Sequence, residues 1–227
     1  MNTVLAPLNI SPVLQFDVQI DWDHMLKSRP ALLKHSELPP YLIKPEVTEL
    51  LRFAKHANNH LMFSTLWRTG ARVSELLALT RESFHIDGIH SYVTIETLKK
   101  RGRKKSGEKI KPPRMVSITE PGYLMELESY LVTNKIKKGE KLFTINRQAV
   151  YKRVKRLVEL AEKGGIKMSV PVSPHTFRHS YAVNCVLHMV DISIIKKLLG
   201  HSSIEQTQIY TEVLGADIGH IMQRVKF

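Results

Sequence analysis

The sequence predicts a mainly α-helical domain that carries one small antiparallel β-sheet. Apolar residues recur at helical spacing through most of the chain, as at Val47, Leu50 and Leu51. Between residues 84 and 118 the pattern changes to strand-forming residues, and the pair Asp87-Gly88 is a strong hairpin-turn signal. Helical runs with one hairpin among them are typical of this α+β class.

Composition points to a polyanionic partner. The 227 residues include 34 basic and 21 acidic ones, a net charge of +13, which favours nucleic acid over a generally basic soluble protein. The single cysteine, Cys185, excludes a disulfide framework and fits a reducing compartment. We expect a cytoplasmic protein. No apolar run approaches the ~18 residues of a membrane helix, and the first residues lack the pattern of a secretory signal.

Residues 1–44 are expected to form an extended or partly ordered arm ahead of a domain that spans residues 45–227. The arm shows little helical periodicity and contains five helix-breaking prolines: Pro7, Pro12, Pro30, Pro39 and Pro40. At the other end, the tail from about residue 214 is amphipathic and has too few apolar partners within its own length.

Helices are predicted wherever apolar residues repeat at intervals of three and four. Pro45 suits the first position of one helix, Gly70 ends the next, and Asn146 is a typical N-cap for the longest. The expected helices cover about residues 45–58, 61–67, 72–79, 121–131, 147–163, 174–188, 191–199, 203–212 and 216–224.

The predicted sheet contains a strongly basic loop. Residues 92–95 are strand formers, and residues 115–118 are expected to form the returning strand. Between them, residues 99–114 include nine Lys or Arg and one acid, Glu108. Because Gly102 and Gly107 break any helix, the segment is predicted to be a β-hairpin loop, most of whose lysines are solvated.

Local signals also predict how the last third of the chain is divided. Gly200 is expected to end a helix in left-handed backbone. Ser203 and Gln206 then have the spacing of a capping box that begins a new helix. Tyr210 follows about two turns later.

Residues suited to a phosphate gather in this region. His175 and Arg178 are three apart, so on a helix they share one face and can meet at one target. His201 and Tyr210 come from the next two short helices. A phosphate-handling site is therefore predicted.

Four sequence boxes together resemble the tyrosine recombinase (phage integrase) family. They are Thr69–Leu76, His175–His179, Leu199–His201, and Tyr210 nine residues further on. Each is weak alone, but their order and spacing are specific, and the match runs from about residue 45 to the end. Residues 96–101, 179–182 and 224–227 further resemble plasmid-encoded members that resolve multimers. The usual N-terminal domain of the family is expected to be missing, since 44 residues are too few for it.

The resemblance implies a site-specific recombinase that cuts and rejoins duplex DNA without metal, ATP or other cofactor. Tyr210 would attack the phosphorus and form a 3′-phosphotyrosyl link. Arg72 and Arg178 would neutralise the phosphate, because a guanidinium is planar, always charged and able to bind two oxygens. His175 is expected to be a general base or donor, and His201 a donor to the same oxygens.

Further roles follow from the same resemblance. Lys99, at the edge of the hairpin loop, would protonate the leaving 5′ oxygen, and Glu75 and His179 would support the site without reacting. The residues expected to bind DNA are Lys100, Arg101, Arg103, Lys104, Arg147, Lys152, Arg153 and Arg156. A homotetramer on two DNA sites is expected, with the C-terminal tail passed between protomers or packed within its own protomer.

Other classes of function fit the sequence less well. A non-catalytic DNA-binding regulator is the main alternative, because residues 194–210 resemble a helix-turn-helix, but such a protein has no need of Arg72, Lys99 and Tyr210 together. A metal-dependent nuclease requires a carboxylate cluster that the sequence lacks. His175 and His179 have zinc-ligand spacing, yet the accompanying Glu is absent. We therefore predict a recombinase of a plasmid or mobile element, acting in resolution, inversion or integration.

Overall fold

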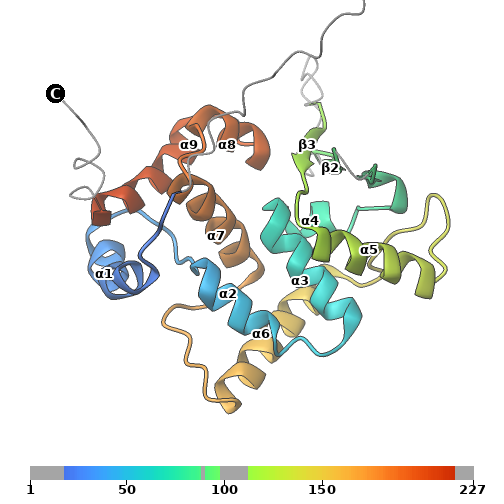
Figure 1. The fold of residues 1–227 in the computed structure, drawn as a ribbon, viewed down its shortest axis with the longest axis horizontal. Helices are drawn as coiled ribbons and strands as arrows, with labels where there is room; N and C mark the ends of the chain where they lie inside the picture. Colours follow the sequence, from blue (N-terminus) through green and yellow to red (C-terminus); the bar gives the residue numbers. More distant parts are fainter. Residues whose placement is uncertain (1–17, 88–89, 98–111, 218–227) are drawn as a thin grey trace, which may run out of the picture.

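The structure, a computed structural model, describes residues 18–87, 90–97 and 112–217. Its elements in chain order are α1 (Trp22–His35), α2 (Lys44–Leu51), α3 (Ala57–Thr69), α4 (Val73–Leu76), η1 (Arg81–Ser83), β1 (Phe84–His85), β2 (Tyr92–Ile95), β3 (Arg114–Ser117), α5 (Pro121–Thr133), α6 (Arg147–Lys163), α7 (Pro174–Leu187), α8 (Ile192–Leu199), α9 (Glu205–Gln208) and the 3₁₀ segment η2 (Ile209–Asp217). The molecule is mostly helical and has one small sheet at one side (Figure 1), so the predicted fold class is confirmed.

The three strands form an antiparallel sheet in the order β1-β2-β3. Val93 of β2 lies opposite Phe84 on one side and Val116 on the other, and Ile95 lies opposite Arg114. The strands that the sequence predicted on both sides of the basic loop therefore pair as expected. The loop itself, residues 98–111, lies outside the described residues.

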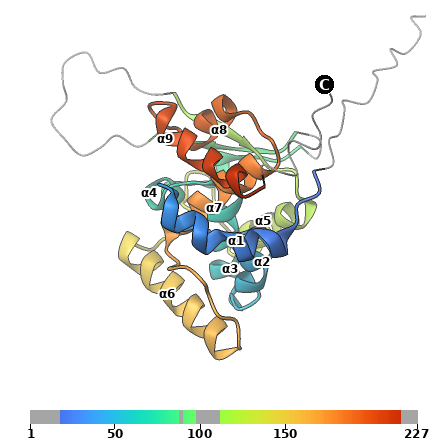
Figure 2. The ribbon, with the colours of Figure 1, turned by 90° about the vertical axis from the view of Figure 1, so that its left-hand side faces the viewer.

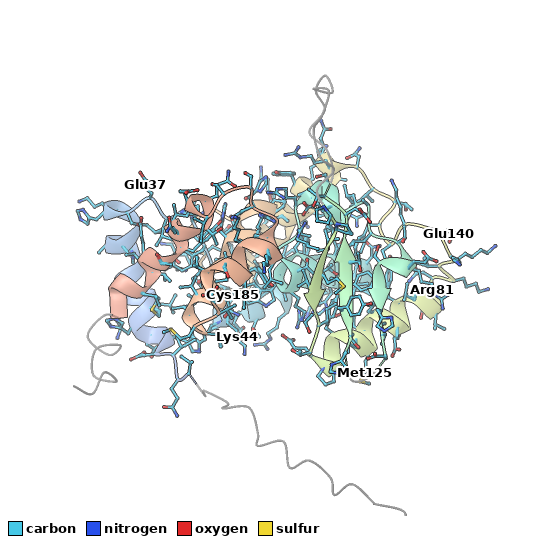
Figure 3. The ribbon with its side chains drawn as sticks, turned by 90° about the horizontal axis from the view of Figure 1, so that it is seen from above. Glu37, Lys44, Arg81, Met125, Glu140 and Cys185 are labelled. Atoms are coloured by element: carbon cyan, nitrogen blue, oxygen red, sulfur yellow. The ribbon has the colours of Figure 1, made fainter. Side chains whose placement is uncertain are left out.

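Helix α7 connects two hydrophobic clusters. The larger cluster fills the space between α2, α3, α5, α6 and the sheet, and includes Phe177. The smaller one joins α1, the second half of α7, α8 and η2, and includes Val183. In Figure 1, α7 lies between these two halves of the molecule, and Figure 3 places Glu37 at the α1 end and Arg81 at the opposite end. Because α7 packs against both clusters, Arg178 and Ser180 are buried in it, whereas His175 is exposed.

Residues 22–35 form the helix α1, so the expectation of an extended arm is wrong for this stretch. The side chain of Asp21 caps the helix by accepting a hydrogen bond from the backbone N of His24 at 2.9 Å. The helix continues through Pro30, although proline inside a helix costs about 3 kcal/mol. Residues 1–17 lie outside the described part of the chain.

Tertiary contacts explain why α1 tolerates its proline. Arg29 is 1% exposed, and its guanidinium donates to both oxygens of Glu46 at 2.6 and 2.8 Å and to the carbonyl of Tyr41 at 2.9 Å. Met25 of the same helix is 2% exposed within the smaller cluster. Such contacts between distant segments have no signal in local periodicity, which is why the sequence misled here.

Some predicted helix ends were also wrong. Helix α2 stops at Leu51 rather than near residue 58, and α4 is one turn, Val73–Leu76, with Arg72 as its N-cap. The capping box at Ser203 is wrong as well: the Gln206 side chain accepts from the backbone N of Ser202 at 3.3 Å. The predicted helix at residues 216–224 falls largely outside the described residues.

Candidate active site

Arg72 lies where α3 ends and α4 begins. Gly70 ends α3 with φ at +58°, and a Cβ there would lie 2.6 Å from Tyr181 Cδ1, so only glycine fits this turn. Arg72 then caps α4: its backbone N and its Nη1 donate to the two carboxylate oxygens of Glu75, at 2.8 and 2.9 Å. The Arg72 side chain keeps 37% exposure, so its guanidinium is braced from one side and open on the other.

Arg178 is held almost completely inside the protein. It is 4% exposed, and it donates through Nη1 to the carbonyl of Gly70 at 2.6 Å and through Nη2 to that of Leu199 at 2.7 Å. Burial, followed by the charge of Arg72, lowers the pKa of Arg178 to about 10, so it stays protonated at neutral pH. The side chain thereby links the end of α3 to the end of α8.

The hydroxyl of Tyr210 is bound by a histidine of α7. Tyr210 Oη lies 2.8 Å from His179 Nδ1, and the Tyr210 ring stacks on that of His201 with centroids 6.4 Å apart. The Tyr210 side chain is 2% exposed. Burial raises the pKa of its phenol, although the charges of Arg178 and Arg72 favour the anion. The tyrosine thus lies within the field of both arginines.

The three histidines of the site are poor bases in the free protein. Burial and then neighbouring positive charge lower the pKa of His179 to about 4 and that of His201 to about 3. The pKa of His175 is also lowered, first by burial and next by Arg147. All three are therefore neutral at pH 7, and each can present one N–H and one lone pair.

His201 follows directly on a left-handed glycine. Gly200 has φ of +65° and ends α8 as predicted. The next residue, His201, has its Nδ1 2.9 Å from the hydroxyl of Thr207. This contact with α9 fixes the orientation of the imidazole and leaves Nε2 as the ring nitrogen that can meet a ligand.

The structure therefore brings together five of the six expected catalytic residues: Arg72, His175, Arg178, His201 and Tyr210. They come from the N-cap of α4, from α7, from the turn after α8 and from η2, and α8 and α9 lie beside one end of α7 (Figure 2). Glu75 and His179 contact Arg72 and Tyr210 respectively. Lys99 lies outside the described residues, as do Lys100, Arg101, Arg103 and Lys104.

The basic residues of α6 differ in what they contact. Arg153 donates through Nη1 to the side-chain oxygens of Asn58 and Asn59 at 2.7 and 2.9 Å, so it ties α6 to the start of α3. Arg156 pairs with Glu159 at 3.3 Å, and Lys152 is exposed. Arg147 stacks on Tyr151 with its Cζ 5.7 Å from the ring centroid.

Sequence reasoning missed a residue of the site, Arg114. The sequence places it within the basic loop, but it is the first residue of β3 and is 7% exposed. Its Nη2 donates to Glu75 Oε2 at 2.6 Å and its Nε to the carbonyl of Leu198 at 2.7 Å. The available signal was the alternation of the strand, since Arg114 and the buried Val116 must point to the same face.

Within residues 18–87, 90–97 and 112–217, no group of three or more His, Cys, Asp or Glu side chains is arranged to hold a metal ion. In the same ranges, no helix has the length and apolar character needed to cross a membrane.

The fold and the site define a class of protein, and comparison with known proteins agrees with it. Residues 40–216 match the model of the phage integrase family. The chain therefore belongs to this family of tyrosine-type site-specific recombinases.

Particular relatives make the comparison more specific. A resolvase of Escherichia coli is 33% identical over 247 residues, with all of this chain and 94% of the relative covered. Tyrosine recombinase XerA of Pyrococcus horikoshii is 32% identical over 191 residues, which cover 83% of this chain and 62% of XerA.

Solved structures show the same fold. The XerA recombinase structure superposes with a TM-score of 0.63 at 25% identity, covering 86% of this chain and 69% of that one. XerH bound to a palindromic difH substrate, in a post-cleavage complex, gives a TM-score of 0.65 at 22% identity, covering 83% of this chain and 54% of XerH.

Proposed function

We propose that this protein cuts and rejoins duplex DNA at specific sites through a covalent link to Tyr210. The observation that carries the proposal is the position of the Tyr210 hydroxyl, hydrogen-bonded to His179 and within the field of Arg178 and Arg72. Several structures with the same fold are complexes of recombinases with DNA, which supports duplex DNA as the substrate.

In the proposed reaction, Tyr210 Oη attacks the phosphorus and a new P–O bond forms while the P–O5′ bond breaks. The phenol proton leaves to a base, for which His175 and the hydrogen-bonded His179 are candidates because the negative charge of a bound phosphate raises their lowered pKa. The 5′ oxygen gains a proton from an acid, assigned to Lys99. Arg72 and Arg178 stabilise the charge that develops on the other phosphate oxygens, with His201 as a further donor. A 5′ hydroxyl of the partner strand then attacks the phosphotyrosine, which restores the phosphodiester without ATP.

The nucleophile is tested by Tyr210→Phe, which removes only the hydroxyl oxygen. The variant should bind a duplex containing its site with unchanged affinity but form no detergent-resistant protein–DNA adduct. Gel electrophoresis after incubation with supercoiled cognate DNA measures the adduct. A normal adduct yield would assign the nucleophile to another residue.

Lys99 is tested in the same assay with a substrate that carries sulfur at the 5′ bridging position. A thiolate leaves readily because its pKa is about 8.5, whereas an alkoxide needs protonation. Lys99→Ala should therefore recover much of its rate on the sulfur substrate, and Arg178→Ala should not. Failure of Lys99→Ala to recover would place the acid elsewhere.

We further propose a homotetramer on two DNA sites, in resolution, inversion or integration, within the cytoplasm. The E. coli resolvases that align with this chain favour resolution. Deletion of the residues after Ala216 should impair pairing of two sites, measured by native gel mobility, more than cleavage of one site. Equal losses would indicate that the tail only stabilises the fold. A fluorescent fusion that colocalises with the nucleoid would test the location.

A further inference from the structure

Arg114 is a third arginine at the site, and the proposed chemistry assigns it no step. It is 7% exposed, yet two of its three guanidinium nitrogens are bonded, Nη2 to Glu75 Oε2 and Nε to the Leu198 carbonyl. The remaining nitrogen, Nη1, is buried and has no hydrogen-bond partner among the described residues. A charge buried to this degree has a structural cost, so the contacts that it makes are informative.

Arg114 and Arg178 bind neighbouring carbonyls at the end of α8. Arg114 Nε donates to Leu198 O at 2.7 Å, and Arg178 Nη2 donates to Leu199 O at 2.7 Å. Both carbonyls lie in the last turn of the helix, where the backbone has no further N–H to offer them. The two arginines therefore hold the turn that carries His201 from two sides.

Gly200 permits this close approach. A Cβ at Gly200 would lie 3.3 Å from Arg114 Nη1 and 3.6 Å from its Cδ, so the guanidinium packs directly under the turn. Because φ of Gly200 is positive, the backbone turns next to Arg114 before it reaches His201.

Arg114 also shares one carboxylate with Arg72. Glu75 is 2% exposed and pairs through Oε1 with Arg72 at 2.9 Å and through Oε2 with Arg114 at 2.6 Å. Burial opposes ionisation of Glu75, but the hydrogen bond and charge of Arg114, followed by Arg72, outweigh it and keep its pKa below the ordinary value. The guanidinium groups of Arg72 and Arg114 thus share one carboxylate, so the position of each constrains the position of the other.

These contacts form a closed circuit. From Arg72 it runs through Glu75 and Arg114 to the end of α8, and from there through Arg178 to Gly70, two residues before Arg72. Each hydrogen bond of the circuit involves an arginine, the backbone closes the remaining steps, and Arg114 is the link to the β-sheet. Moving β3 therefore moves Arg72 and His201 together.

We infer that Arg114 is a positioning residue for strand cleavage: it fixes Arg72, through Glu75, and the His201 turn, through Leu198, relative to β3. The inference rests on the proposed function, because Arg72 and His201 matter only if a phosphate reacts between them. Since β3 is the strand that follows the basic loop, Arg114 also couples that part of the sheet to the phosphate site.

Two variants of Arg114 test the inference in a single-turnover adduct assay. Arg114→Met removes the charge, and Arg114→Lys keeps it but cannot span both Glu75 and Leu198. Both should form adduct about 100-fold more slowly than the parent, which is the scale of a 1 Å misplacement, while duplex affinity stays within about threefold. An unchanged adduct rate in Arg114→Met would overturn the inference.

Arg29→Met is the matched control, because Arg29 is also a buried arginine paired with a glutamate. It should lower the melting temperature but leave the adduct rate within about threefold where the protein is folded. An equal rate loss in Arg29→Met would mean that lost stability alone explains the effect. If Arg114→Met does not fold, Arg114→Met with Glu75→Gln removes both charges, while the amide oxygen of Gln can still accept a hydrogen bond from Arg72. That double variant should fold and remain slow; a normal rate would overturn the inference.

A double-mutant cycle identifies the residue through which Arg114 acts. With Arg72→Lys already present, Arg114→Met should slow adduct formation by much less than in the parent, because the guanidinium to be positioned is gone. Equal factors in both backgrounds would refute the route through Arg72. If the parent protein forms no adduct, the proposed function fails; a normal parent with an unaffected Arg114→Met refutes only the positioning role.

Discussion

At the scale of single residues, the hydroxyl of the candidate nucleophile, Tyr210, is buried and hydrogen-bonded. Tyr210 is 2% exposed and its hydroxyl lies 2.8 Å from His179 Nδ1. A buried hydroxyl without a partner costs free energy, so the histidine stabilises this position of the tyrosine. In the proposed reaction His179 keeps this contact and can accept the phenol proton while Tyr210 Oη attacks the phosphorus.

We predict that His179 and Tyr210 are coupled in stability. His179→Leu leaves the Tyr210 hydroxyl buried and unpaired, which should lower the free energy of unfolding by about 1–3 kcal/mol. Adding Tyr210→Phe removes the other partner, so the double variant should lose less than the sum of the two single changes. Urea unfolding of the four proteins measures this. Strictly additive losses would mean that the hydrogen bond contributes nothing.

At the scale of secondary-structure elements, the basic residues of α6 differ in role: some hold the fold together and others are exposed to solvent. Arg153 is bound to Asn58 and Asn59, which joins α6 to the start of α3. Lys152, one residue earlier, is exposed. Residues adjacent in the sequence point to different sides of a helix, so one can hold the fold while its neighbour meets a ligand.

We therefore predict that substitution of Arg153 lowers stability, whereas substitution of its neighbour Lys152 leaves stability nearly unchanged. Arg153→Ala should lower the free energy of unfolding by about 1.5–3 kcal/mol, because it removes hydrogen bonds to a charged group. Lys152→Ala should change that free energy by less than about 0.5 kcal/mol. If Lys152 contacts a phosphate, the same variant should reduce the slope of log affinity against log salt by about 0.9. An unchanged slope would place Lys152 away from the DNA.

At the scale of the whole molecule, the buried and positively charged site keeps its histidines neutral by lowering their pKa. Burial, with the arginines nearby, lowers the pKa of His179 to about 4 and that of His201 to about 3, from an ordinary value of 6.5. As the pH falls below 6.5, these two histidines become protonated in the unfolded chain, whereas in the native protein they stay neutral until the pH approaches their lowered pKa values. Because the unfolded state then binds more protons, stability must fall as the pH falls.

The free energy of unfolding should therefore decrease from about pH 6.5 toward pH 4, the range between the ordinary pKa and those of the folded histidines. His201→Gln should reduce the steepness of this loss by about one proton. Denaturant unfolding at several pH values measures it, with His188, an exposed histidine, changed to Gln as the control. Equal slopes for the parent and His201→Gln would contradict the lowered pKa.

The sequence by itself determined the helical class and the hairpin, because these follow from periodicity and turn residues, and its resemblance to a family pointed to the candidate site residues. Gly70 and Gly200 were located correctly as helix ends, since both need left-handed backbone. Tertiary structure decided the rest. Helix α1 persists through Pro30 because Arg29 is bonded to Glu46, 17 residues away. Arg114 reaches Glu75, 39 residues away, and Leu198, 84 away. Such contacts depend on how elements pack, and no local pattern records that.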